Sequence, residues 1–170
     1  MSKAYIICGS PASGKTTYGK ELAKNKKAVF LDIDISTERL VQLALAESGH
    51  DKDDRDSSYF KNTYREVIYK TMFDIARENL EWNDVVIVGP FTREVRMESW
   101  PEILTTELGV EVEVHYIYCN AEERRRRMIE RNSERDKAKL KDWDFINAYY
   151  GEEQPPPFKH VFVDTSKKER

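Results

Sequence analysis

Residues 9–16 read Gly9-Ser10-Pro11-Ala12-Ser13-Gly14-Lys15-Thr16, which matches the pattern G-x-x-x-x-G-K-[ST]. The stretch follows the apolar run Ala4–Cys8 and precedes a helix-compatible segment, Tyr18–Lys24, as this pattern requires. Its glycines let backbone N–H groups turn toward phosphate oxygens, and the helix adds its positive dipole end. Lys15 then reaches the β- and γ-phosphates and the Thr16 hydroxyl binds Mg²⁺. The stretch predicts a nucleoside triphosphate site, and a glycine-rich turn without a ligand is the weaker interpretation.

The composition indicates one globular domain. The chain has 170 residues, of which 35% are charged and 39% are apolar, and its net charge of −3 argues against a general nucleic-acid coating function. Cys8 and Cys119 form no C-x-x-C pair and are expected to be reduced. The sequence shows no signal peptide and no apolar stretch of about 20 residues that would span a membrane, so we expect a cytoplasmic protein without a membrane partner.

Apolar runs of strand type alternate with helical stretches along the chain. The expected strands are Ala4–Cys8, Ala28–Asp32, Asp84–Val88, Val112–Cys119 and His160–Asp164. The expected helices are Gly14–Lys24, Thr37–Ser48, Tyr59–Leu80, Arg96–Leu108, Ala121–Arg131 and Trp143–Tyr149. This alternation predicts an α/β fold with a parallel sheet and helices on both faces. In the long helix, a stripe at helical spacing is expected to face the sheet: Tyr64, Val67, Ile68, Met72, Ile75 and Ala76.

Two aspartates follow the second expected strand, where ligands of open parallel sheets bind. Asp34 can accept the proton of a hydroxyl that attacks the γ-phosphate, and Asp32 can serve Mg²⁺ through a bound water. The alternative is that one of them caps the helix expected from Thr37, although Ser36 and Thr37 compete for that role. The third expected strand ends in Gly89-Pro90 without a carboxylate, which makes motor-type and switch-type NTPases less fitting.

The segment from about 121 to 141 is basic, with nine Lys or Arg residues against five Asp or Glu residues. Arg124, Arg127, Arg131 and Arg135 recur at spacings of three and four and are expected to share one helix face. Guanidinium groups are suited to holding phosphate oxygens during transfer, so this segment is predicted to be a lid over the phosphate site. The alternative is a solvated helix with internal ion pairs.

An acidic segment, residues 47–56, lies between the second strand and the long helix. Arg55 and Asp56 are candidate contacts for a phosphate acceptor, and the alternative is a solvated loop. The histidines show no metal-ligand spacing, and His115 and His160 on expected strands are interpreted as structural.

With these residues assembled, the chain resembles the small P-loop kinases around polynucleotide kinase, zeta toxins and chloramphenicol phosphotransferase, and more closely the ATP-binding "AAA domain" proteins of that group. The resemblance covers nearly the whole chain and is carried by Gly9–Thr17, Phe30–Asp34, Asp54–Ser57, Gly89–Arg93, Cys119-Asn120 with Arg124–Arg131, Arg135-Asp136 and Val163–Thr165. It implies a three-layer P-loop NTPase sandwich with strand order 2-3-1-4-5 and a basic lid, in one domain over residues 1–170.

The resemblance also implies roles for individual residues. It makes Lys15 and Thr16 the contacts of ATP and Mg²⁺, Asp34 the general base, and Arg131 and Arg135 the lid arginines. Nucleotide binding is assigned to Gly9, Ser10, Pro11, Ala12, Ser13, Gly14, Lys15, Thr16, Thr17 and Arg127, metal binding to Thr16 and Asp32, and acceptor binding to Asp34, Arg55, Asp56 and Arg93. Polynucleotide kinases carry an acceptor-binding arginine soon after the aspartate, whereas here Arg39 lies five residues on, which disfavours a nucleic-acid acceptor.

The expected function is ATP-dependent phosphoryl transfer to a hydroxyl of a small metabolite, nucleoside, nucleotide or antibiotic. Two alternatives remain: a kinase of nucleic-acid 5′ ends, and a nucleotide-dependent regulatory module with weak hydrolysis. No residue in the sequence identifies the acceptor.

Overall fold

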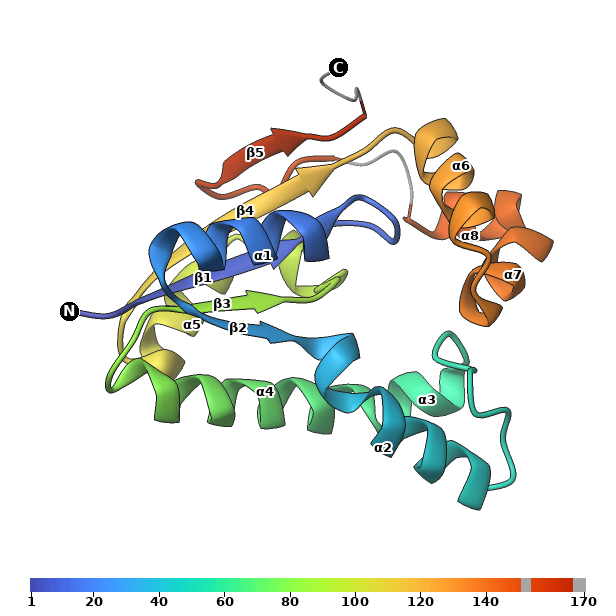
Figure 1. Ribbon diagram of the computed structural model, residues 1–170, viewed down its shortest axis with the longest axis horizontal. Helices are drawn as coiled ribbons and strands as arrows, with labels where there is room; N and C mark the ends of the chain where they lie inside the picture. The colour runs from blue at the N-terminus through green and yellow to red at the C-terminus, as the bar shows by residue number, and fades with distance from the viewer. Residues whose placement is uncertain (151–153, 167–170) are drawn as a thin grey trace.

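The computed structural model describes residues 1–150 and 154–166 and shows a five-stranded sheet in which all pairings are parallel (Figure 1). Its strands are β1 (Lys3–Cys8), β2 (Val29–Asp32), β3 (Val85–Val88), β4 (Glu111–Tyr118) and β5 (Val161–Asp164). Their spatial order is β2-β3-β1-β4-β5, as expected. This order puts the ends of β2, β3 and β1 side by side, so the segments that follow them meet at one edge.

Nine helical segments surround the sheet in the described part of the chain. They are α1 (Lys15–Lys26), α2 (Ile33–Glu47), α3 (Ser58–Thr63), α4 (Arg65–Leu80), the 3₁₀ helix η1 (Glu94–Arg96), α5 (Trp100–Leu108), α6 (Ala121–Arg131), α7 (Glu134–Lys141) and α8 (Trp143–Tyr150). In this same part, residues 1–150 and 154–166, no helix is both long and apolar enough to cross a bilayer.

The two faces of the sheet pack against different helices because successive strand residues point to opposite sides. Tyr5 and Ile7 of β1 join the core under α1, together with Ala23 of that helix. Ala4 and Ile6 join the larger core on the other face, which α2, α4 and α5 complete. All four residues of β3 are buried, as expected for a strand covered on both faces.

The helix expected over Tyr59–Leu80 is two helices, α3 and α4, with a break at Tyr64. The expected stripe is therefore partly wrong: Val67 and Ile75 are exposed, and Tyr69 and Phe73 are buried in their place. Ile68, Met72 and Ala76 face the core as predicted. The face of α4 that meets the sheet therefore includes Tyr69, which also lines the cavity described below.

Two other helix starts differ from the expectation for local chemical reasons. Helix α2 begins at Ile33, four residues before Thr37, because Asp32 caps it. The helix expected to begin at Arg96 begins instead at Trp100, as α5, and Arg96 is the last residue of the 3₁₀ helix η1. Helix α5 has a proline, Pro101, in its first turn. A proline is tolerated there because the first N–H groups of a helix have no intrahelical partner.

Helices α6, α7 and α8 stand together beyond the carboxyl ends of the strands, and α2 and α3 extend past the same edge from the opposite side (Figure 1). The phosphate-loop stretch of residues 9–16 lies at this edge, between β1 and α1. The fold therefore gathers the second, third and first strand ends, the α2–α3 region and the basic helices around one place.

The core of the larger sheet face is expected to dominate the stability of the fold. Leu104 of α5 is 1% exposed, whereas the neighbouring Ile103 is 45% exposed. Leu104→Ala should lower the free energy of unfolding by about 2–5 kcal/mol, because it removes a buried side chain and leaves a cavity. Ile103→Ala, the matched control, should change it by less than about 1 kcal/mol. Urea denaturation measures both, and equal losses would contradict the described orientation of α5.

Candidate functional site

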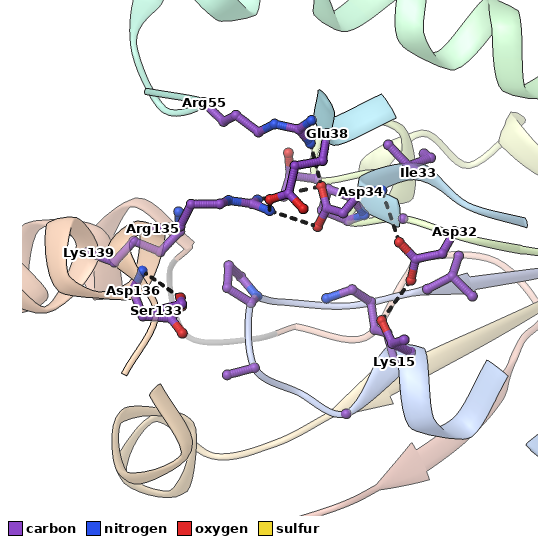
Figure 2. Close-up of a pocket in the computed structure, with 18 of the residues that line it drawn as sticks. Lys15, Asp32, Ile33, Asp34, Glu38, Arg55, Ser133, Arg135, Asp136 and Lys139 are labelled. Atoms are coloured by element: carbon purple, nitrogen blue, oxygen red, sulfur yellow. Dashed lines mark hydrogen bonds and ion pairs between the residues drawn. The ribbon is translucent and has the colours of Figure 1, made fainter. Parts of the chain in front are cut away.

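A cavity of about 860 Å³ opens at the carboxyl edge of the sheet, and Figure 2 shows part of its lining. The phosphate loop and Asp32 form one side of it. Arg55, Phe60 and Tyr69, from the α2–α3 loop and helices α3 and α4, line another part. Arg131, Arg135 and Lys139 approach from the basic helices. Its volume falls within the range of small-molecule sites, about 300–1,000 Å³.

The phosphate loop has the backbone geometry that an anion site needs. Gly14, at φ 93°, is the N-cap of α1. Because glycine has no side chain to cap the helix, the first N–H groups of α1 are left for a ligand in the cavity. Gly9 has φ 143°, and a Cβ there would lie 2.3 Å from the Ile117 carbonyl oxygen. Lys15 Nζ donates to the carbonyl oxygen of Ser10 at 2.7 Å, which keeps the ammonium group at the loop.

Asp32 joins the phosphate loop to helix α2. One carboxylate oxygen accepts from the Thr16 hydroxyl at 2.7 Å, and the other accepts from the backbone N–H groups of Asp34 and Ile35 at 2.9 and 3.1 Å. The expectation that Ser36 and Thr37 would leave both aspartates without a capping role was therefore wrong. Asp32 is the cap, because it directly precedes the helix and its side chain folds back onto it.

Asp34, in the first turn of α2, lies between two guanidinium groups (Figure 2). Arg55 donates to its Oδ1 at 2.7 Å, and Arg135 of α7 lies 3.5 Å from its carboxylate. Burial opposes ionisation of Asp34, but Arg135, Arg55 and Lys15 outweigh it and hold the pKa of this carboxyl below its ordinary value. About half of the side chain remains exposed, so the carboxylate is charged and accessible from the cavity.

The four arginines of the basic segment were expected to share one helix face. This prediction is wrong. Helix α6 ends where Asn132 adopts a left-handed conformation, φ 49°, and α7 begins after Ser133, whose side chain caps it. Arg124 points inward, is 1% exposed and donates to the Cys119 carbonyl. The remaining three arginines have different partners in the cavity.

Arg127 reaches the phosphate loop, where one terminal nitrogen donates to the Ala12 carbonyl at 3.3 Å and to Thr165 Oγ1 at 3.1 Å. Arg131 binds the carboxylate of Asp136 through two nitrogens at 2.5 and 2.7 Å. Arg135 reaches Asp34 and, at 3.9 Å, Glu38. The three arginines therefore line one cavity, although each is bound to a different carboxylate or loop.

Lys139 is the principal residue that the sequence interpretation missed. It is 6% exposed and pairs with Asp56, so that α7 is tied to the α2–α3 loop. Glu38, Arg65 and Tyr69 also line the cavity without having been expected. A signal for α7 was present, because Ser133 and Asp136 have the spacing of a capping pair, but the contact of Lys139 with Asp56 depends on the tertiary fold.

Arg93 does not line this cavity. It lies with Gly9 and Ser10 around a second, smaller cavity on the other side of Pro90 and Thr92. The remaining expected site residues do line the main cavity, except Ser13, which is buried in the loop.

Known structures share this fold. A candidate kinase from Chloroflexus aurantiacus has a TM-score of 0.70 at 16% identity, with 99% of this chain and 91% of that chain covered. A sugar kinase from a Janibacter species has a TM-score of 0.59 at 16% identity, covering 96% and 86% of the two chains. Shikimate kinase from Bacteroides thetaiotaomicron has a TM-score of 0.56 at 17% identity, covering 99% and 89%. The fold is that of the P-loop kinases.

No curated protein matches this chain in sequence. The family model described as "AAA domain" matches residues 5–153, which is most of the chain and includes the phosphate loop, both aspartates and the basic helices. The protein belongs to this AAA domain family.

Proposed function

We propose that this protein is an ATP-dependent phosphotransferase that acts on a hydroxyl group of a small molecule. The observation that carries the proposal is that a single cavity contains the phosphate loop, an accessible carboxylate at Asp34 and the arginines of α6 and α7. A nucleotide-binding module without an acceptor would need the first of these features but not the second. The structural neighbours include small-molecule kinases, which agrees with this assignment.

Within the P-loop kinases, we place the chain in the group around polynucleotide kinase, zeta toxins and chloramphenicol phosphotransferase, with residues 1–170 as one domain and residues 121–141 as its lid. The support is the position of Asp34 directly after β2 together with basic helices over the cavity. The free, buried thiols of Cys8 and Cys119 fit the proposed cytoplasmic location.

The residues around Thr16 fit a magnesium ion bound together with ATP. No group of three metal-ligating His, Cys, Asp or Glu side chains comes together within the described residues. Mg²⁺ does not need such a group, because it is commonly held by one or two protein oxygens, waters and substrate phosphates. Thr16 and the buried carboxylate of Asp32 would hold it, directly or through water. When bound, Mg²⁺ neutralises charge on the phosphate oxygens.

Asp34 is the proposed acceptor of the hydroxyl proton. Its carboxylate is ionised, half exposed and held by Arg55 in a fixed orientation. A lowered pKa makes it a weak base, but phosphoryl transfer passes through a loose transition state in which positioning and charge stabilisation contribute most of the catalysis. Asp34 would thus orient the attacking hydroxyl and take its proton as the bond to phosphorus forms.

The lid arginines would stabilise negative charge on the transferred phosphoryl group. Arg131 and Arg135 line the same cavity as Lys15, and guanidinium groups present planar sets of donors that match phosphate oxygens. Arg127 would act from the loop side, where it already contacts Ala12. On the acceptor side, Arg55, Asp56 and Lys139 would surround the bound molecule.

A screen of ATP consumption tests the proposal. The panel should contain nucleosides, nucleotides, sugars, sugar acids, aminoglycosides and 5′-hydroxyl oligonucleotides, with Lys15→Ala as the control. We expect a small hydroxyl compound to stimulate ATP consumption and Lys15→Ala to abolish it, because the loop loses the ammonium group that faces the phosphates. Stimulation by oligonucleotides alone would favour the nucleic-acid kinase. Turnover that persists in purified Lys15→Ala protein would overturn the site.

Asp34→Asn separates a kinase from a binding module. The substitution keeps a hydrogen-bonding oxygen for Arg55 but removes the charge and the basic oxygen. Transfer to the acceptor should fall about 100-fold or more, which is within the contribution of general-base catalysis. Binding of a fluorescent ATP analogue should change little because the phosphate loop is intact. Full transfer activity would exclude the proposed role of Asp34.

Asp32 should have separable roles in stability and in metal binding. Asparagine caps helices about as well as aspartate, so Asp32→Asn should leave the free energy of unfolding nearly unchanged, whereas Asp32→Ala should lower it by about 1 kcal/mol. In both variants, the factor by which Mg²⁺ increases the affinity for the nucleotide should be smaller than in the wild type by about tenfold or more. Urea denaturation and calorimetric titration with and without Mg²⁺ measure these effects. An unchanged Mg²⁺ dependence in both variants would remove Asp32 from the metal site.

A further inference from the structure

A second cavity of about 300 Å³ adjoins the main one. It is lined by Gly9, Ser10, Pro90, Thr92, Arg93, Val95, Arg96 and Tyr116. Pro90 and Thr92 line both cavities, so the loop after β3 forms the boundary between them. The two cavities therefore meet at this loop, and Asp34 lines the larger of them.

The second cavity is positively charged. Arg93 and Arg96 line it, and none of its lining residues is acidic. The two arginines are three residues apart around the 3₁₀ turn η1, where side chains at this spacing lie above one another. Glu94, the acid between them, is directed elsewhere, because both its carboxylate oxygens bind Arg65 at 2.8 and 2.7 Å.

The main cavity differs in this respect, because each of the arginines that line it, and Lys139, is paired with an acid. Arg55 pairs with Asp34, Arg65 with Glu94, Arg127 with Glu123, Arg131 with Asp136, Arg135 with Asp34 and Glu38, and Lys139 with Asp56. Arg93 and Arg96, in contrast, form no ion pair with any residue that the structure describes. Arg96 donates to the Gln154 carbonyl at 2.8 Å, which leaves further N–H donors of its guanidinium. An anion could bind there without breaking an ion pair.

The loop that carries Thr92 and Arg93 is held in a strained conformation. Phe91 has φ 45°, although it ends no helix and is not part of the phosphate loop. Its ring is fully buried and lies 5.0 Å from Tyr69 and 5.2 Å from Trp100 between ring centroids. A Cβ on Gly89 would approach this ring to 3.0 Å. Left-handed backbone is unfavourable at a bulky residue and persists where the surroundings fix it, often at ligand sites.

We propose that the second cavity binds an anionic group, a carboxylate or a phosphate, of the same acceptor whose hydroxyl is held by Asp34. This inference rests on the proposed kinase function and makes it more specific, because it assigns the acceptor to the class of small hydroxylated anions. Arg93 and Arg96 bind the anionic group, and the Phe91-anchored loop sets its separation from the reacting hydroxyl.

Small-anion binding tests the subsite without an identified acceptor. The phosphate loop is first saturated with Mg²⁺ and the ATP analogue AMP-PNP, so that an added anion does not bind there. Inorganic phosphate and, separately, acetate are then titrated at constant ionic strength and followed by calorimetry. Binding should be weakened about tenfold or more in Arg93→Gln/Arg96→Gln, since charge-assisted hydrogen bonds are lost. Arg125→Gln, at an exposed position of α6 outside both cavities, is the matched control.

The comparison of the two anions shows whether the group is a phosphate or a carboxylate. Arg93→Gln alone should show part of the loss, and its folding is secure because Arg93 makes no side-chain hydrogen bond within residues 1–150 and 154–166. Equal anion affinity in the wild-type protein and both variants, or no binding of either anion to the wild type, would overturn the subsite. Failure of AMP-PNP to bind would instead contradict the kinase function. Even then, weaker anion binding in Arg93→Gln than in the wild type would support an anion site in the second cavity.

In the acceptor screen, paired compounds that differ only in the anionic group give an independent readout. A nucleoside with its monophosphate, and a sugar with its sugar acid, are suitable pairs. The anionic member should have the lower KM, and Arg93→Gln should raise that KM with little change in the KM for ATP. Equal KM values for both members, unaffected by the substitution, would contradict the proposal.

Discussion

The carboxylate of Asp32 is the contact on which the rest of the site depends. It is 5% exposed, and it accepts hydrogen bonds from the Thr16 hydroxyl and from two backbone N–H groups of α2. Strand β3 separates β1 from β2 in the sheet, so this carboxylate connects two segments that are not neighbours. Through it, the start of α1 fixes the start of α2, and Asp34 is placed in that first turn.

Beyond Asp32, the part of the cavity that we propose binds the acceptor is built from paired charges. Burial lowers the pKa of Arg55, whose side chain is 7% exposed, and Asp34 opposes that shift. Arg55 is the buried member of this pair, and removing Asp34 would leave its charge without a partner. The proposed catalytic carboxylate is therefore also structural, which is why asparagine, with its remaining oxygen, probes the chemistry of Asp34 better than alanine.

The sequence predicted those features that depend on local order along the chain. The phosphate loop, the five strands and helix α6 lie close to where the patterns placed them, because turn geometry and periodicity are local. Asp34 and Arg55 were each identified, but their contact at 2.7 Å across 21 residues was not. Lys139 was missed for the same reason, since on a basic segment it resembles a solvated lysine until the fold brings it to Asp56. Arg93 was assigned to the acceptor, and the fold alone reveals that it faces a different cavity.

The two arginines of the proposed lid, Arg131 and Arg135, are not equivalent. Arg131 binds Asp136 in a bidentate pair, and this carboxylate is 2% exposed, so moving Arg131 would leave a buried charge without its partner. Arg135 lies 3.5 Å from Asp34 and 3.9 Å from Glu38, which exceeds the 2.7–2.9 Å typical of charge-assisted hydrogen bonds. Exchanging these contacts for phosphate oxygens would therefore cost little. In the proposed reaction, Arg135 is therefore the residue that leaves Asp34 and binds the phosphoryl oxygens as negative charge develops on them. Loss of this neighbouring positive charge would raise the pKa of Asp34 at the step where Asp34 accepts the proton.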